Sequence, residues 1–176
     1  FADQAGRNNY TNESFNKKDD ERWVTGAGIY FQDSENGLIR GNNVYDNTDG
    51  IRIVDSASAR VQRNTVYDHA GNNGRGIVVK RSDDTTVGGL FVKPGQGNVW
   101  DNTLTNNYQG IRVHDSNDVT VHYNTVNSSL KEAIHFSRNS DNGLIDQNTV
   151  NGGTHGIRID RSDLITITDN QVADVN

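Results

Sequence analysis

Hydrophobic positions along this chain alternate with polar ones over short stretches, and the same arrangement recurs six times. In the clearest copy, residues 111–114 read Ile-Arg-Val-His and residues 119–121 read Val-Thr-Val. Alternation with a period of two predicts a β-strand with one buried side and one side facing solvent. Neither short strand buries its apolar side alone, so we expect the copies to stack on one another.

The copies align on a glycine near the start of each one and on an asparagine after its second strand. The commonest spacing is 14 residues from glycine to asparagine and 8 to the next glycine, which gives a repeat of 14 + 8 = 22 residues. A period near twenty with strand patterns predicts a solenoid of parallel strands. The glycine position holds Gly28, Gly50, Gly76, Gly110, Ala133 and Gly156, and the asparagine position holds Asn42, Asn64, Asn102, Asn124, Asn148 and Asn170.

Each copy supplies apolar residues at three strand positions, and these define the predicted core. We expect the asparagines to form an internal ladder, because stacked amides satisfy one another when they are buried. The first strand supplies Ile29, Ile51, Ile77, Ile111, Ile134 and Ile157, the second Ile39, Val61, Val99, Val121, Ile145 and Ile167, and the third Val44, Val66, Leu104, Val126, Val150 and Val172. A second polar column at a bend is predicted from Ser34, Ser56, Ser82, Ser116, Asn139 and Ser162.

This pattern, which extends from Gly28 to Val172, resembles the right-handed parallel β-helix superfamily of polysaccharide-acting proteins. The prediction is an all-β fold, a right-handed parallel β-helix of about six 22-residue turns over residues 28–176. The handedness is implied by the resemblance and agrees with the general chirality of parallel crossovers. Residues 1–27 have two interpretations. They are either the remnant of an earlier turn, which would imply further β-helix turns in a parent protein, or an N-terminal cap with a long loop.

Two insertions interrupt the 22-residue repeat around the third copy. Residues 70–75 add four residues before the strand at 77–80, and residues 83–97 add twelve after it. Insertions in repeat proteins fall in loops, often beside the binding face. We therefore predict a groove centred on Lys80, with these two segments as its walls.

Basic side chains gather at the outward positions of the first strand, although the chain carries a formal charge of −6. Successive turns lie about 4.8 Å apart, close to the length of one sugar unit, and arginine suits carboxylate recognition. The strip predicts binding of an acidic polysaccharide, whereas the alternative is that these side chains only keep a sheet face soluble. Its predicted substrate-binding residues are Arg52, Lys80, Arg112, Arg158 and Tyr30.

Composition excludes several other classes of function. The chain contains no Cys and no Met, which rules out disulfides and cysteine-ligated metal sites, and its negative charge argues against nonspecific nucleic-acid binding. No apolar run is long enough for a membrane span, and we expect an extracellular, secreted protein. Asp33, Asp55 and Asp115 are predicted to form turns, with calcium as the alternative because carboxylates and carbonyls are its ligands.

Breaking or inverting a uronate at C5 needs a group that neutralises the carboxylate, a base and an acid. In this interpretation Arg112 is the neutralising group, His114 or His135 is the base, and Tyr108 is the acid. The alternative is that these histidines are ordinary surface groups. We expect His122 and His155 to be surface or bend residues.

Within the superfamily, segments 76–81 and 110–113 look most like the C-terminal half of mannuronan C5-epimerase catalytic modules. The catalytic motif of that family, Tyr-Gly-Phe-Asp-Pro-His, has no match here, and the only proline is Pro94. Two hypotheses therefore stand side by side. One is part of a larger epimerase or lyase that acts on an alginate- or pectin-like polymer. The other is a non-catalytic carbohydrate-binding or structural rod, such as a phage-spike, adhesin or matrix module.

Overall fold

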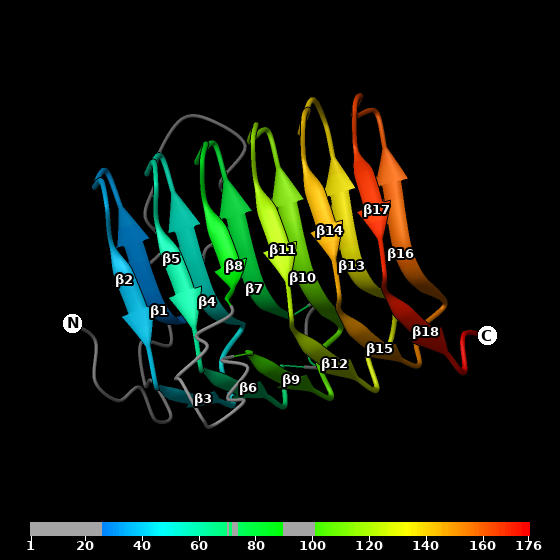
Figure 1. Cartoon of the computed structure of the whole chain (residues 1–176). Helices are drawn as coiled ribbons and strands as arrows, with labels where there is room; N and C mark the ends of the chain where they lie inside the picture. The colour runs from blue at the N-terminus through cyan, green and yellow to red at the C-terminus, as the bar shows by residue number, and fades with distance from the viewer. Residues whose placement is uncertain (1–25, 70, 72–73, 90–100) are drawn as a thin grey trace, which may run out of the picture.

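The chain forms a parallel β-helix, as the repeat predicts, in a computed structural model that describes residues 26–69, 71, 74–89 and 101–176. Eighteen strands in the described residues form three six-stranded sheets, and every pairing between neighbouring strands is parallel. Each turn of the coil contributes one strand to each sheet, so the turns follow one another along the rod (Figure 1). Residues 1–25, on which the two N-terminal interpretations depend, lie outside the described residues.

The three sheets differ in strand length. The first sheet has six-residue strands: β1 (Ala27–Gln32), β4 (Asp49–Val54), β7 (Arg75–Lys80), β10 (Gln109–His114), β13 (Glu132–Ser137) and β16 (His155–Asp160). The second has three-residue strands: β2 (Leu38–Arg40), β5 (Arg60–Gln62), β8 (Thr86–Gly88), β11 (Thr120–His122), β14 (Leu144–Asp146) and β17 (Thr166–Thr168). The third also has three-residue strands: β3 (Asn43–Tyr45), β6 (Thr65–Tyr67), β9 (Thr103–Thr105), β12 (Thr125–Asn127), β15 (Thr149–Asn151) and β18 (Gln171–Ala173).

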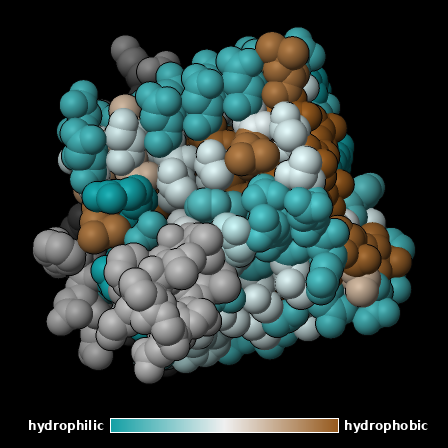
Figure 2. Space-filling model, viewed as in Figure 1, coloured by the Kyte–Doolittle hydropathy of each residue, from teal (hydrophilic) through white to brown (hydrophobic). Residues whose placement is uncertain are grey.

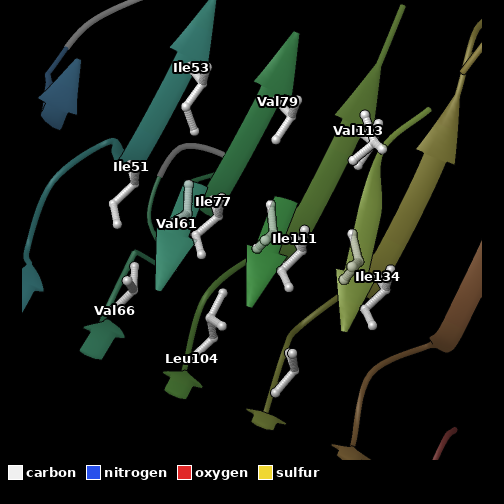
Figure 3. Close-up of a cluster of buried hydrophobic side chains, with 14 of the residues drawn as sticks. Ile51, Ile53, Val61, Val66, Ile77, Val79, Leu104, Ile111, Val113 and Ile134 are labelled. Carbon is white, nitrogen blue, oxygen red and sulfur yellow. The ribbon is translucent and has the colours of Figure 1, made fainter. Parts of the chain in front are cut away.

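The apolar columns lie inside the coil with like residues stacked on like. Ile51 pairs with Ile77, Ile77 with Ile111, and Ile111 with Ile134, all of them fully buried. Figure 3 shows these side chains pointing inward from the first sheet toward Val61, Val66 and Leu104. The coil is thin, so each turn is covered mainly by the turns on either side of it, which is the expected packing of a solenoid.

The glycine position is explained by crowding on the inside of the coil. A Cβ added to Gly110 would collide with the carbonyl oxygen of Ala133 in the next turn and with the side chain of Val126. A bulky residue there would push the first sheet away from the third. Packing therefore explains why a small residue, Gly or Ala, recurs at this position in every turn.

Both polar columns exist as hydrogen-bonded ladders. The Nδ2 group of Asn102 donates to Oδ1 of Asn124 at 2.9 Å, and Nδ2 of Asn64 donates to Oδ1 of Asn102 at 2.9 Å. The same bond links all six predicted asparagines, from Asn42 to Asn170. In the serine ladder, the backbone N–H of each member donates to the hydroxyl of the next, as from Ser82 to Ser116 at 2.9 Å.

Two positions in these columns were assigned wrongly from the sequence. The second-strand column contains Val87, not Val99, because β8 pairs Val87 with Val61 and Val121. In the neighbouring copies the second-strand position lies at a fixed distance after the ladder serine and before the ladder asparagine. In the third copy, counting back from Asn102 leads to Val99, whereas counting forward from Ser82 leads to Val87. The extra residues therefore follow β8, and Val99 lies outside the described residues.

The predicted groove walls change accordingly. Residues 83–88 continue the coil, and Arg75 belongs to strand β7, so neither is part of an inserted loop. The remaining wall segments, residue 70, residues 72–73 and residues 90–97, lie outside the described residues. The proposed walls therefore stay a prediction.

The serine ladder passes through Ser140 instead of Asn139. Ser140 accepts from the backbone N–H of Ser116 and donates its own N–H to Ser162. The bend after β13 holds one additional residue, since Arg138 and Asn139 both have positive φ values, of 53° and 54°. A fixed count of six residues from the glycine position therefore stops one residue short.

The acidic residues at the bend after the first sheet have the expected turn conformation. Asp33, Asp55 and Asp115 have φ values of 51°, 49° and 50°. This left-handed region is one that Asp tolerates better than most residues.

The end of the rod formed by β16, β17 and β18 leaves apolar side chains in solvent. Leu164 is 79% exposed, Ile167 48% and Val172 47%. The counterparts of Ile167 and Val172 in earlier turns, such as Ile145 and Val150, are buried. Figure 2 shows hydrophobic atoms gathered on this side of the molecule.

Among the described residues, no helix is long and apolar enough to cross a bilayer.

Candidate functional site

The outward positions of the first sheet form the columns that the sequence predicts. Arg112 pairs with His135 and His135 with Arg158, while Lys80 lies beside His114 in the neighbouring column. Because alternate residues of a strand face the same side, Lys80 and Arg112 lie on one face of the sheet. We call this surface the outer face. Its central part is well packed: Arg52 is 4% exposed, Lys80 8% and His135 6%.

A third outward column, directly before the glycine position, was missed from the sequence. It holds Asp49, Arg75, Gln109 and Glu132 in successive turns. Asp49 is 2% exposed and Glu132 is fully buried. A polar residue precedes the glycine position in every copy except the first, where it is Ala27. That recurrence was the signal in the sequence that could have found the column.

Asp49 organises one ionic cluster. Its carboxylate accepts from Arg75 Nε and Nη2, both at 2.8 Å, and from Arg52 Nη1 at 3.0 Å. The two arginines are thereby engaged with the protein itself. Arg52 retains an Nε–H that is buried and has no hydrogen-bond partner among the described residues.

Glu132 organises a second cluster. Its Oε2 accepts from Gln109 Nε2 at 2.6 Å, its Oε1 accepts from Arg158 Nη1 at 2.9 Å, and Lys131 Nζ lies 3.6 Å from Oε1. Burial favours the protonated acid, but the hydrogen bond from Gln109 and the neighbouring cations outweigh it and hold the pKa of Glu132 below its usual value. Glu132 is therefore ionised at neutral pH, with both oxygens engaged.

His135 lies beside this cluster with both ring nitrogens buried and without a hydrogen-bond partner in the described part of the chain. Burial, together with the positive charges of Arg112 and Arg158, lowers its pKa from 6.5 to about 4, against the opposing effect of Glu132. The ring is therefore neutral at pH 7. Buried polar groups are normally bonded, so this exception calls for an explanation.

Arg112 is half-buried and forms no ion pair or hydrogen bond with any described residue. Burial and the charges of Arg75 and Arg138 lower its pKa, although an arginine remains protonated at physiological pH. Arg112 and His135 lie in register on adjacent strands. They are thus a cation and a hydrogen-bonding ring without a partner in the described part of the chain.

His114 differs from His135 in having partners. Its Nδ1 lies 3.3 Å from Ser137 Oγ, and its Nε2 lies 3.0 Å from Asp115 Oδ2. Burial lowers its pKa to about 4, with Arg112, Arg138 and Lys80 acting in the same direction and Asp115 against it. His114 is neutral at pH 7 and held in one orientation.

The remaining predicted residues lie at the margins. Tyr108 immediately precedes β10 and its ring contacts the ammonium group of Lys131, 5.9 Å from the ring centroid. Tyr30 begins the Arg112 column and is 43% exposed. His122 lies on the second sheet, where its ring is tilted against Tyr123, and its buried Nε2 has no partner among the described residues. His155 is exposed, as predicted.

The fold and the outer face define a parallel β-helix whose longest strands present a buried polar array along one side. The chain belongs to the family described as "Periplasmic copper-binding protein (NosD)", whose model matches residues 4–94 and 87–176. The comparison with curated proteins found no match.

Solved β-helix structures are similar to this chain. The periplasmic alginate epimerase AlgG is 23% identical with a TM-score of 0.59, covering 82% of this chain and 32% of AlgG. The Azotobacter vinelandii mannuronan C-5 epimerase AlgE4 A-module is 20% identical with a TM-score of 0.57, covering 85% and 50%. A DFA-IIIase from Arthrobacter chlorophenolicus A6 without its lid is 11% identical with a TM-score of 0.59, covering 85% and 46%. The chain spans between a third and a half of these proteins, and the likeness shows the fold.

The family description implies copper, but the described residues do not fit a resident copper ion. Soft copper ligands are missing because the chain has neither Cys nor Met. In the described ranges, no group of three or more His, Asp or Glu side chains could hold a metal ion. His135, whose two ring nitrogens have no partner among the described residues, lies in register with two arginines, whose charges repel a cation.

Proposed function

We propose that the outer face binds an acidic polysaccharide outside the cytoplasm, with its centre at Arg112, His135 and Arg158. The observation that carries this proposal is that Arg112 and His135, on adjacent strands, have no partner within the described ranges. A half-buried cation without a counter-ion favours an anionic ligand, and a carboxylate fits the planar donors of arginine. The periplasmic description of the family and of AlgG supports the location.

The length of the face supports a polymer as the ligand. Equivalent positions recur about every 4.8 Å, so a chain of uronate units would meet similar side chains in consecutive turns. AlgG and AlgE4, which share the fold, are alginate and mannuronan epimerases by name.

The finer proposal is an epimerase or β-eliminating lyase. In this scheme Arg112 neutralises the uronate carboxylate, which makes the C5 proton more acidic, and a neutral histidine removes that proton. His114 and His135 both qualify as the base by being neutral at pH 7. Tyr108 is the candidate acid, at the entrance to β10.

A non-catalytic binding rod is the second candidate. It is favoured by the lack of the epimerase motif in the sequence and by Tyr108, whose ring contacts Lys131. Incubation with alginate and with polygalacturonate distinguishes the two. Lyase activity raises the absorbance of unsaturated chain ends, and epimerisation exchanges the C5 proton in D₂O. If neither signal changes while oligouronate still binds, the catalytic proposal fails and the binding proposal stands.

Replacing Lys80 and Arg112 together by alanine tests where the ligand binds. We expect roughly tenfold weaker binding of an oligouronate at low salt and a smaller difference at moderate salt, because screening weakens ionic contacts. Calorimetry measures both affinities. The control is R60A, which removes an exposed arginine from the second sheet.

If the double variant binds as tightly as the parent chain, the outer face is not the binding site. Equal losses in R60A and in the double variant would indicate attraction by overall charge instead of a defined site.

A further inference from the structure

His135 lies where a bound anion would be its missing hydrogen-bond partner. The ring is 6% exposed, both nitrogens lack partners among the described residues, and Arg112 lies beside it in register. By contrast, His114 already contacts Ser137 and Asp115. The two histidines of the outer face are therefore not equivalent.

The charged groups around His135 come from three strands. Arg112 approaches from β10, Glu132 from its own strand β13, and Arg158 and Asp160 from β16. Glu132 is already bound to Gln109 and Arg158. Arg112 has no ion-pair partner among the described residues, and it is the charge that most disfavours a proton on His135 after burial itself.

We propose that His135 is the specificity-determining residue of the outer face, binding an anionic group of the glycan as an imidazolium jointly with Arg112, with uptake of one proton. This inference rests on the proposed function. An anion that neutralises Arg112 and accepts a hydrogen bond from the ring reverses the balance that keeps the free ring neutral. Binding and protonation then favour each other, as linkage requires.

The inference separates the two candidate bases. An imidazolium donates a hydrogen bond and no longer accepts a proton, so His135 becomes the anion ligand. His114, neutral and oriented by Asp115, remains as the base of the catalytic scheme. The proton on His135 comes from solvent, so the step requires no further reactant.

The expected effect is a pH-dependent affinity. The pKa of His135 in the free chain is about 4. For each pH unit by which the bound ligand raises this pKa, the affinity at low pH increases tenfold. We expect roughly tenfold tighter binding at pH 5 than at pH 7. A purely arginine-based site would bind equally well at both values.

Calorimetry with the full chain tests this, using tetramannuronate and tetragalacturonate at pH 5, 6 and 7. Measurements in two buffers of different ionisation enthalpy give the number of protons taken up, and NMR follows the His135 ring with and without ligand. H135N removes the titrating group and reports any protonation of the ligand itself. H155N is the matched control, since His155 is exposed on the next turn. Circular dichroism at each pH verifies that every variant is folded.

Proton uptake that approaches one in the parent chain and in H155N, and that is lost in H135N, supports the inference. Binding without proton uptake and with equal affinity at the three pH values overturns it, while the proposed function stands. Failure to bind either tetrasaccharide at any pH overturns the proposed function itself. Equal binding of the neutral tetrasaccharide cellotetraose overturns the requirement for an anion.

Discussion

On the outer face, two buried acids are paired, whereas one arginine and one histidine have no partner among the described residues. Asp49 and Glu132 are buried, and each is held by at least two donors, whereas Arg112 and His135 have no partner among the described residues. A buried carboxylate is tolerated only with such partners, because its desolvation is costly. The arrangement therefore fixes the acids as structural groups and leaves the bases available for a ligand.

This division predicts the effect of changing Glu132. Glu132→Ala leaves Gln109 and Arg158 without an acceptor, and we expect a loss of about 1–3 kcal/mol in the free energy of unfolding. Glu132→Gln keeps one carbonyl oxygen and should lose less. Urea unfolding measures both, with E35A as a control at an exposed acidic residue. If neither Glu132 variant changes the free energy of unfolding, the hydrogen bonds to Glu132 add no stability.

At the scale of elements, the asparagine ladder joins the second sheet to the third in every turn. Asn102 is fully buried, accepts from the backbone N–H of Asn64 at 3.0 Å and donates to the carbonyl of Val61 at 2.8 Å. Its side chain thus satisfies backbone groups of the neighbouring turn at a bend where strand pairing is interrupted. Each ladder member stabilises the turn next to it as well as its own.

Substitution along the ladder should therefore depend on position. We expect Asn102→Ala to lower the free energy of unfolding by about 3 kcal/mol, since it leaves several buried groups unpaired. Asn170→Ala should cost less, because Asn170 ends the ladder in the described residues and is only half-buried. The exposed Asn43 provides the control and should change stability by less than about 0.5 kcal/mol. Thermal and urea unfolding compare the three, and equal losses at positions 102 and 170 would contradict a cooperative ladder.

At the scale of the whole molecule, the rod buries histidines in their neutral form. Burial lowers the pKa of His69, His114, His122 and His135 below the ordinary 6.5, to about 4 for His114 and His135. The unfolded chain therefore binds more protons than the folded one in acid. The resulting stability is fully present above pH 6.5 and is lost as the pH falls toward 4.

Acidification should accordingly unfold the protein well before its carboxylates are neutralised. Between pH 7 and pH 5 we expect the free energy of unfolding to fall by about 2 kcal/mol for each of His114 and His135. Urea titrations at pH 7, 6 and 5 measure the change, and H135N should show a smaller fall than the parent chain. A midpoint that does not move over this range would contradict neutral burial of these rings.

The sequence by itself determined the coil. A period of two within each strand and of 22 between copies assigns most apolar residues to a face and every turn to its neighbours, because such short strands bury their apolar sides by stacking. The core columns, the asparagine ladder and the shared face of Lys80, Arg112, His135 and Arg158 follow from it. Val87 was missed because of the long insertion after β8, and Ser140 because of one additional residue after β13; insertions shift a count without changing the local pattern.

The tertiary structure decided which side chains pair. Glu132 meets Gln109 and Arg158 from the turns on either side, and Asp49 meets Arg75 of the next turn. Those contacts depend on side-chain torsions and on burial. The periodicity of a strand assigns a residue to a face but says nothing about either. For the same reason the sequence marked Arg112 and His135 as candidates, but only the fold shows that neither has a partner among the described residues while the acids beside them are satisfied.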